Sequence, residues 1–97
     1  MRVRDTAWIN YQISRARVKE LLQYCRETKD LSLVEKAIRE TNPSISEVLR
    51  MNLIKGLSYD KIMMGKTYIP MGMKDFYGYR RKALATLNRL LLEGQEV

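Results

Sequence analysis

Basic side chains are concentrated in one segment of this chain, where they can neutralise the negative charges of a polyanion. Residues 66–89 hold six basic side chains and a single acid, so this segment has a net charge of +5, against +7 for the whole chain. Lysine and arginine concentrated on one element are the usual electrostatic footprint of a nucleic-acid-binding protein. The alternative is a solvated basic face that only keeps the protein soluble. The six residues are Lys66, Lys74, Arg80, Arg81, Lys82 and Arg89.

Residue types on which catalysis and metal binding depend are scarce. The chain has no histidine, which is the commonest general base and metal ligand, and its single cysteine, Cys25, allows neither an internal disulfide nor a cysteine-based zinc site. Acids such as Asp30 and Glu35 lack a supporting set of ligands, and no glycine-rich phosphate loop occurs. We therefore predict that the protein is not an enzyme and uses no cofactor, metal ion or small-molecule substrate.

Length and hydropathy favour a single domain over residues 1–97. The chain is 45% hydrophobic and 30% charged, which is typical of a small globular domain. No apolar run approaches the ~20 residues that span a bilayer. Residues 1–20 are polar and charged, unlike a secretory signal. We expect a cytoplasmic protein without a membrane partner.

Apolar residues recur at three- and four-residue spacing, which predicts an all-α fold of about five helices. We expect the first helix over residues 5–28 and a second, short helix over residues 31–40. A third helix is predicted to start at Ser44, because Ser44 and Glu47 have the spacing of a capping box. Gly56 is a natural end for this third helix.

A short helix and then a long basic helix complete the predicted fold. The short one begins at Ser58, a good N-cap, and points Ile62 and Met63 inward. The long one runs from about residue 72 to residue 92. At about 100° per residue, its apolar face carries Phe76, Tyr79, Ala83, Leu87 and Leu90. The opposite face carries Lys74, Tyr77, Gly78 and Arg81, with Lys82 at its margin and Arg80 at the edge of the apolar arc.

These two helices have the parts of a helix-turn-helix, in which a short helix braces a longer one that enters the major groove of DNA. Lys74, Tyr77 and Arg81 lie one turn apart on the outer face, from which side chains can reach base edges. The connection, over residues 65–71, is longer than the three or four residues of a compact turn. Many helical bundles place a short helix beside a long one, so the pattern alone does not decide the function.

Two sequence segments carry a more specific resemblance. They are VLRMNLIKGLSYDKI and IPMGMKDFYGYRRKALATL, within residues 48–91. The first has an apolar helix, a glycine, a Leu-Ser cap and an aromatic residue; the second has an aromatic pair before a basic run and Ala-Leu. Both resemble the C-terminal half of small phage transcriptional regulators of the late-gene activator (ArpU) type, which are similar to promoter-recognition region 4 of sigma factors.

The resemblance implies DNA binding in the transcriptional control of a phage or integrated element, with two departures. Gly72 stands where such proteins usually have a serine or threonine cap, and glycine also caps tolerably. Gly78 stands where a long polar or basic residue usually faces DNA. A glycine there either deletes a contact or permits a close approach of backbone.

We therefore expect a sequence-specific transcriptional regulator that binds double-stranded DNA and inserts its last helix into the major groove. Residues 44–92 would form the DNA-binding part, while the helices of residues 1–41 offer a surface for a homodimer. RNA polymerase is a further partner that this hypothesis allows. The residues expected to contact DNA are Lys66, Thr67, Lys74, Tyr77, Arg80, Arg81, Lys82 and Arg89, with Arg80 and Arg89 favoured as phosphate contacts.

Two other functions fit the same pattern. A phage DNA-packaging component of the small-terminase type would also use a helix-turn-helix, but as a closed ring of many copies. An adaptor that binds polymerase or a repressor would use the basic helix to contact protein.

Overall fold

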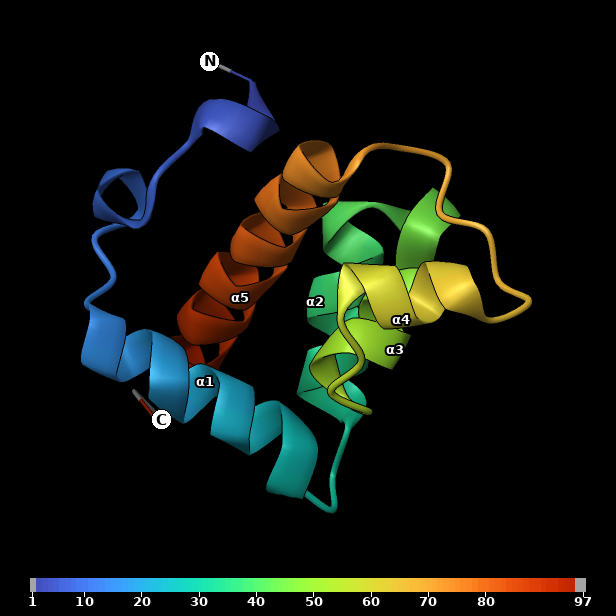
Figure 1. Cartoon of the computed structure of the whole chain (residues 1–97). Coiled ribbons are helices and arrows are strands. Elements are labelled where there is room, and N and C mark those ends of the chain that lie inside the picture. Colours follow the sequence, from blue (N-terminus) through green and yellow to red (C-terminus); the bar gives the residue numbers. More distant parts are fainter. Residues whose placement is uncertain (1, 96–97) are drawn as a thin grey trace.

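The C-terminal helix α5 (Met73–Gln95) runs through the middle of the molecule, and the other elements pack around it (Figure 1). The computed structural model describes residues 2–95, and within this range the predicted all-α fold is confirmed. No helix of the described chain has the length and apolar character that crossing a membrane requires. The remaining elements are the 3-10 helices η1 (Val3–Asp5), η2 (Trp8–Tyr11) and η3 (Pro43–Ile45) and the α-helices α1 (Arg15–Glu27), α2 (Ser32–Thr41), α3 (Ser46–Leu53) and α4 (Tyr59–Met64).

One hydrophobic core joins α5 to the four shorter α-helices. The apolar face predicted for α5 is confirmed, except that Tyr79 is only half-buried. The most extensive contact of α5 is with α2. The buried side chains of α5 are Phe76, Ala83, Leu84, Leu87 and Leu90. The side chains that share this core include Leu21 and Cys25 of α1, Val34 and Ile38 of α2, Val48 and Leu49 of α3, and Ile62 of α4.

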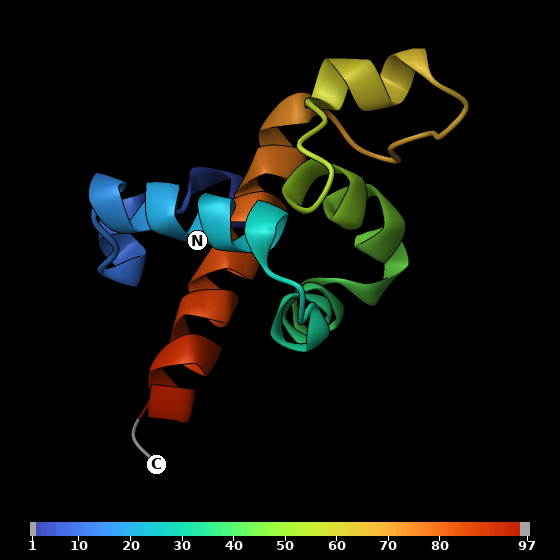
Figure 2. The ribbon, with the colours of Figure 1, turned by 90° about the horizontal axis from the view of Figure 1, so that it is seen from below.

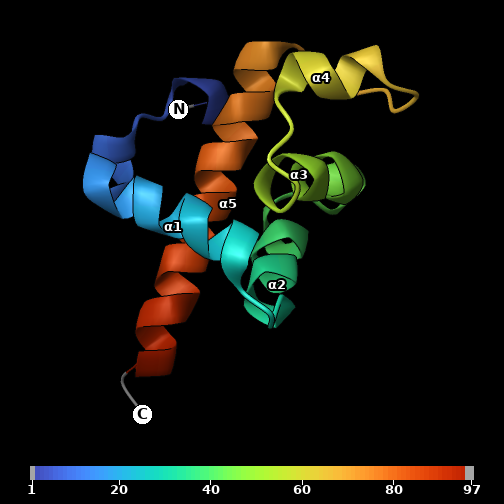
Figure 3. The ribbon, with the colours of Figure 1, turned by 60° about the horizontal axis from the view of Figure 1, so that its bottom comes forward.

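The first α-helix is shorter than the predicted span 5–28. It begins at Arg15, because the Ser14 hydroxyl accepts a hydrogen bond from the Arg17 N–H at 3.1 Å and caps the helix. Gln12 has a left-handed backbone with φ 58°, a conformation that interrupts a right-handed helix. Residues before it form η1 and η2 instead. Figures 2 and 3 show α1 crossing α5, while the N-terminal segment lies beside the first turns of α5.

The third helix also begins later than predicted. Pro43–Ile45 forms η3, and α3 starts at Ser46. The predicted capping box is not formed, because the Asn42 side chain caps the 3-10 turn by accepting from the Ser44 N–H at 3.1 Å and from the Ser44 hydroxyl at 2.6 Å. After α3 the chain turns at Gly56, as predicted, where φ is +73° and the N–H donates to the Asn52 carbonyl.

Candidate nucleic-acid interface

Helix α4 braces the first turn of α5. Its N-terminus is capped as predicted, because the Ser58 hydroxyl accepts a hydrogen bond from the Lys61 N–H at 3.2 Å. The contact with α5 depends on Tyr59, whose ring centroid lies 5.7 Å from that of Phe76. The Tyr59 N–H donates to the Tyr77 hydroxyl at 3.2 Å, and the Tyr59 hydroxyl donates to the Met71 carbonyl at 2.7 Å. A short helix thus positions a longer one, as in a helix-turn-helix.

The sequence identified only part of this brace. Ile62 is buried as predicted, but Met63 is 38% exposed, so its predicted inward position is wrong. Tyr59 was missed as a contact residue, although an aromatic residue directly after a helix cap was a usable signal. The connection over residues 65–72 is held by Ile69, which is buried and whose N–H lies 3.3 Å from the Met63 sulfur.

The N-terminal segment covers the middle of the face of α5 that the sequence assigned to DNA. η1 is the second most extensive contact of α5, after α2. It crosses at Gly78, where an added Cβ would lie 2.8 Å from both N and Cα of Arg4 and from the carbonyl carbon of Val3. Gly78 therefore permits a close approach of backbone, which is one of the two roles that the sequence left open.

Arg81 is engaged by this N-terminal segment. Its Nε donates to the Thr6 carbonyl at 2.9 Å, and its Nη2 donates to the Arg4 carbonyl at 3.1 Å. The side chain is half-buried, so the predicted outward position, ready to reach base edges, is wrong. The physical reason is that the carbonyls of a short 3-10 turn have few intrahelical partners, and a guanidinium can satisfy two of them at once.

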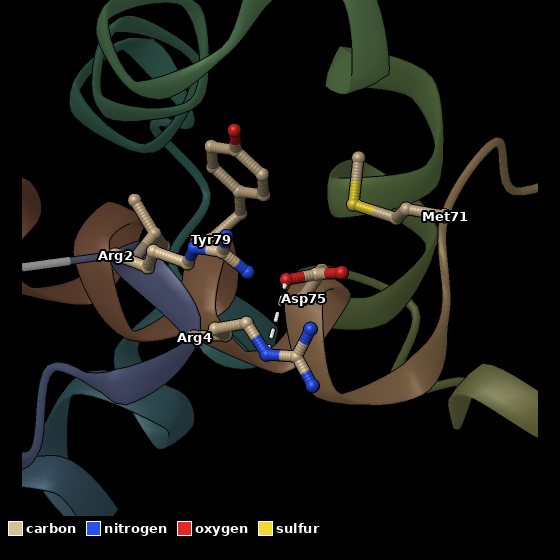
Figure 4. A pocket seen from close by; sticks show the side chains of 6 residues that line it. Arg2, Arg4, Met71, Asp75 and Tyr79 are labelled. Carbon is tan, nitrogen blue, oxygen red and sulfur yellow. Dashed lines mark ion pairs between the residues drawn. The ribbon is translucent and has the colours of Figure 1, made fainter.

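Two ion pairs flank the crossing. Arg4 Nε lies 3.6 Å from Asp75 Oδ1 beside a cavity of about 360 Å³ that Met71 and Tyr79 also line (Figure 4). Lys74 Nζ lies 3.9 Å from Asp5 Oδ1, and its side chain is 66% exposed. Exposed pairs of this kind add little stability. They leave Lys74 able to exchange its weak partner for a phosphate.

Tyr77 and Arg80 form a second, more enclosed contact. Tyr77 is half-buried, and the Arg80 guanidinium carbon lies 5.3 Å from the centre of its ring, within cation–π range. Burial lowers the pKa of the Arg80 guanidinium below its usual range. Its Nε is enclosed and has no hydrogen-bond acceptor among the described residues. Arg80 therefore sits at the edge of the apolar face, as predicted, but without the carboxylate that would usually accompany a buried arginine.

The remaining predicted residues are dispersed around these contacts. Lys66 is exposed in the connection and Thr67 is half-buried. Lys82 is exposed on α5, whereas Arg89 is held by Glu93 at 3.0 Å and by Glu40 of α2 at 3.1 Å. Arg89 therefore helps to fasten α5 to α2, in addition to any contact with phosphate.

The cations around the crossing come from two distant parts of the sequence. Lys74 and Lys82 stand four residues before and after Gly78, so all three lie on one stripe of α5. η1 crosses this stripe between the two lysines and adds Arg4, while Arg2 precedes η1. We call these four cations (Arg2, Arg4, Lys74 and Lys82) the arm–helix surface. No pattern of residue types indicated that the two N-terminal arginines belong to this surface.

Comparisons with known proteins find no match for this chain. No family model matches the chain, and no curated protein and no solved structure matches it. The resemblance of residues 48–91 to late-gene activators therefore depends on the two sequence segments that carry it.

Proposed function

We propose that this protein is a transcriptional regulator of a phage or integrated element that binds double-stranded DNA through the arm–helix surface. The observation that carries the proposal is the convergence of the N-terminal arginines and the α5 lysines on one side of a braced helix. Arg2 and Lys82 have no ion-pair partner among residues 2–95, so their charges are free to neutralise phosphates. The two segments that resemble late-gene activators support the regulatory role.

The crossing at Gly78 changes how α5 would approach DNA. An α-helix with its side chains is about 10–12 Å across, and the major groove is about 12 Å wide, so a bare helix already fills the groove. η1 thickens α5 at Gly78, and the helix with its arm is too broad to lie lengthwise in the groove. We propose that α5 instead points its first turn into the groove.

This approach gives the basic residues separate roles. Lys74 in the first turn, with Lys66 and Thr67 in the connection before it, would reach base edges. Arg2 and Lys82, farther from the tip of the helix, would contact phosphates on either side of the groove. Selectivity then comes from the start of α5, and most of the affinity comes from the phosphate contacts.

Selection of bound duplexes from a random DNA library, at about physiological salt, tests the proposal, because weak phosphate-only binding fades under that condition. We expect one motif to be enriched, and a two-fold repeat in it would indicate a homodimer. Binding to the enriched duplex and to a scrambled one is then compared for variants. Lys74→Ala should weaken binding to the enriched duplex more, whereas Lys82→Ala should weaken both alike.

A folded protein that enriches no motif would contradict the proposal. The control variant is Lys29→Ala, which removes an exposed lysine in the connection between α1 and α2 and should leave both affinities unchanged. Light scattering on the same sample checks the packaging alternative, for which a closed ring of many copies is the expected result.

One observation favours the adaptor alternative. Met64 is 85% exposed at the end of α4, and Tyr68 is 74% exposed in the connection that follows. Large apolar side chains that are exposed only four residues apart are candidates for a protein contact. If the protein is an adaptor, Met64→Ser and Tyr68→Ser should abolish binding to the partner, and Lys74→Ala should leave that binding intact.

A further inference from the structure

Arg80 and Arg81 of α5 line one cavity beside η2 and α1, without an acid to balance them. Arg80 is close enough to Arg26 and Arg81 for both positive charges to act on it. No carboxylate within residues 2–95 is within ion-pair distance of any of the three. Arg81 is bonded only to neutral backbone carbonyls, and the enclosed Nε of Arg80 has no acceptor.

This arrangement is costly for the protein alone. A buried charge is normally paired, because taking it out of water without compensation is strongly unfavourable. Here the neighbours of Arg80 are cations and the ring of Tyr77. The ring offers a modest attraction, but it does not neutralise the charge. An anion from outside the described chain would supply the missing compensation.

A cavity lies at this point. It has a volume of about 180 Å³ and is lined by Arg80 and Arg81, with walls formed by Trp8, Val18 and Tyr77. Sites for drug-sized ligands are usually ~300–1,000 Å³, so this cavity fits a small anion rather than a whole nucleotide. The Arg81 guanidinium is already held by the Thr6 and Arg4 carbonyls, so little side-chain freedom is lost when an anion binds.

We propose that this cavity binds a phosphate group between Arg80 and Arg81. A guanidinium matches the geometry of a phosphate, since its N–H groups can donate in parallel to two oxygens. The phosphate can come from the backbone of a nucleic acid or from free phosphate in solution. The proposed site does not depend on the transcriptional role, because free phosphate would occupy it as well as the phosphate of a nucleic-acid backbone.

Trp8 provides a direct reporter. It is the only tryptophan of the chain and it lines the cavity. The full-length protein is titrated with inorganic phosphate at constant ionic strength, and the Trp8 emission is recorded. We expect a saturable change, with no comparable change when chloride replaces phosphate. An emission change that is linear in phosphate, or equal for the two anions, would overturn the proposal.

Arg80→Met tests the residue, because it keeps much of the side-chain length and removes the charge. We expect it to raise the Kd for phosphate by about tenfold or more, as befits the loss of a charge-assisted hydrogen bond. Lys29→Met removes an exposed charge in the connection between α1 and α2, away from the cavity, and should bind phosphate like the wild type. Circular dichroism establishes that both variants are folded, and an Arg80→Met protein with unchanged phosphate affinity would refute the assignment.

A second titration distinguishes the two sources. A DNA duplex is added at several salt concentrations to the wild type and to Arg80→Met. If the cavity takes a backbone phosphate, the variant should bind DNA more weakly and lose about 0.9 from the slope of log K against log salt. If it takes free phosphate, the DNA slope stays unchanged and only the response to inorganic phosphate disappears. If Arg80→Met changes neither the response to inorganic phosphate nor the salt dependence of DNA binding, the cavity is not a phosphate site. DNA binding that remains intact in that case leaves the proposed regulatory role unaffected.

Discussion

The backbone of Arg4 crosses α5 directly over Gly78, so closely that a Cβ at position 78 would lie 2.8 Å from both N and Cα of Arg4. The crossing joins the N-terminal segment to the C-terminal helix and decides which side chains of α5 are exposed. It brings Arg81 under the N-terminal carbonyls and leaves Lys74 and Lys82 outside. Glycine at this position thus serves the packing of the protein itself.

Gly78→Ala should destabilise the protein, although alanine is the better helix former. The gain in helix propensity is about 1 kcal/mol. The added Cβ meets backbone, which cannot move aside as a flexible side chain would, and such overpacking costs about 1–3 kcal/mol. We expect a net loss of up to about 2 kcal/mol, measured as the free energy of unfolding in urea.

Gly94→Ala is the matched control, because nothing lies within 4 Å of a Cβ at that position of the same helix. It should leave stability unchanged or slightly raised. The same pair of changes in a chain that lacks residues 2–6 isolates the cause, since Gly78→Ala should no longer destabilise there. If Gly78→Ala still lowers the free energy of unfolding in the shortened chain, the added Cβ does not act through a clash with the N-terminal segment.

Arg81→Met should loosen the N-terminal segment, because it removes the donors to Thr6 and Arg4 and leaves two carbonyls without them. The expected cost is about 1–3 kcal/mol for the two bonds. Hydrogen exchange should report faster exchange over residues 3–11 than in the wild type. Lys82→Met, which changes the adjacent but exposed residue, should leave that exchange unaffected. Equal protection in both variants would show that Arg81 does not hold the segment.

The charge on the arm–helix surface should determine how steeply DNA binding depends on salt. Each phosphate that a lysine or arginine neutralises contributes about 0.9 to the slope of log K against log salt. Arg2→Ala and Lys82→Ala should each reduce the slope by about this amount, and the double variant by about twice as much. Anisotropy of a labelled duplex between about 50 and 200 mM salt measures this. Additive losses support one shared surface, and an unchanged slope in either variant excludes that residue from it.

Stability should fall in acid through the ion pair between Glu35 and Arg50. Arg50 donates to both carboxylate oxygens of Glu35 at 2.7 Å, and these hydrogen bonds lower the pKa of Glu35 from its usual range. Because the folded pKa is depressed, the pair stabilises the protein above the unfolded value of about 4.3, and this contribution is lost as pH falls through the folded pKa. Both side chains are partly exposed, so the contribution is only about 1 kcal/mol.

Urea unfolding at pH 7 and at about pH 3 measures this dependence. Glu35→Gln should lower stability at pH 7 and reduce its fall in acid. The Arg50→Met variant should behave in the same way, and the double variant should be no worse than the more damaging single one. Identical pH profiles for the wild type and Glu35→Gln would show that other carboxylates cause the acid sensitivity.

Cys25 should be inert in the folded protein. It is fully buried, and burial raises the pKa of its thiol to about 11, so about one molecule in a thousand carries a thiolate at pH 8. A thiol reagent should therefore modify it only when the protein opens, at a rate that rises with urea. Rapid modification in native buffer, at the rate of a free thiol, would contradict the burial of α1 against α5.

Local patterns in the sequence determined much of the helical framework. The three- and four-residue spacing predicted the all-α fold and the apolar face of α5. Ser58 caps the start of α4, and Gly56 follows the end of α3, as their chemistry predicts. These features depend on residues a few positions apart, so the sequence alone contains them.

Which face of α5 is open depends on long-range packing. The hydrogen bond from Arg81 to Thr6 joins residues 75 positions apart, and its acceptor is a backbone carbonyl, which every residue has. Because any residue could supply this carbonyl, no pattern of residue types in the sequence predicts the contact. Gly78 was visible as an anomaly, but its two roles, a missing DNA contact or a close approach of backbone, look identical in sequence. The physical difference is the position of the N-terminal segment, which depends on how the whole chain packs.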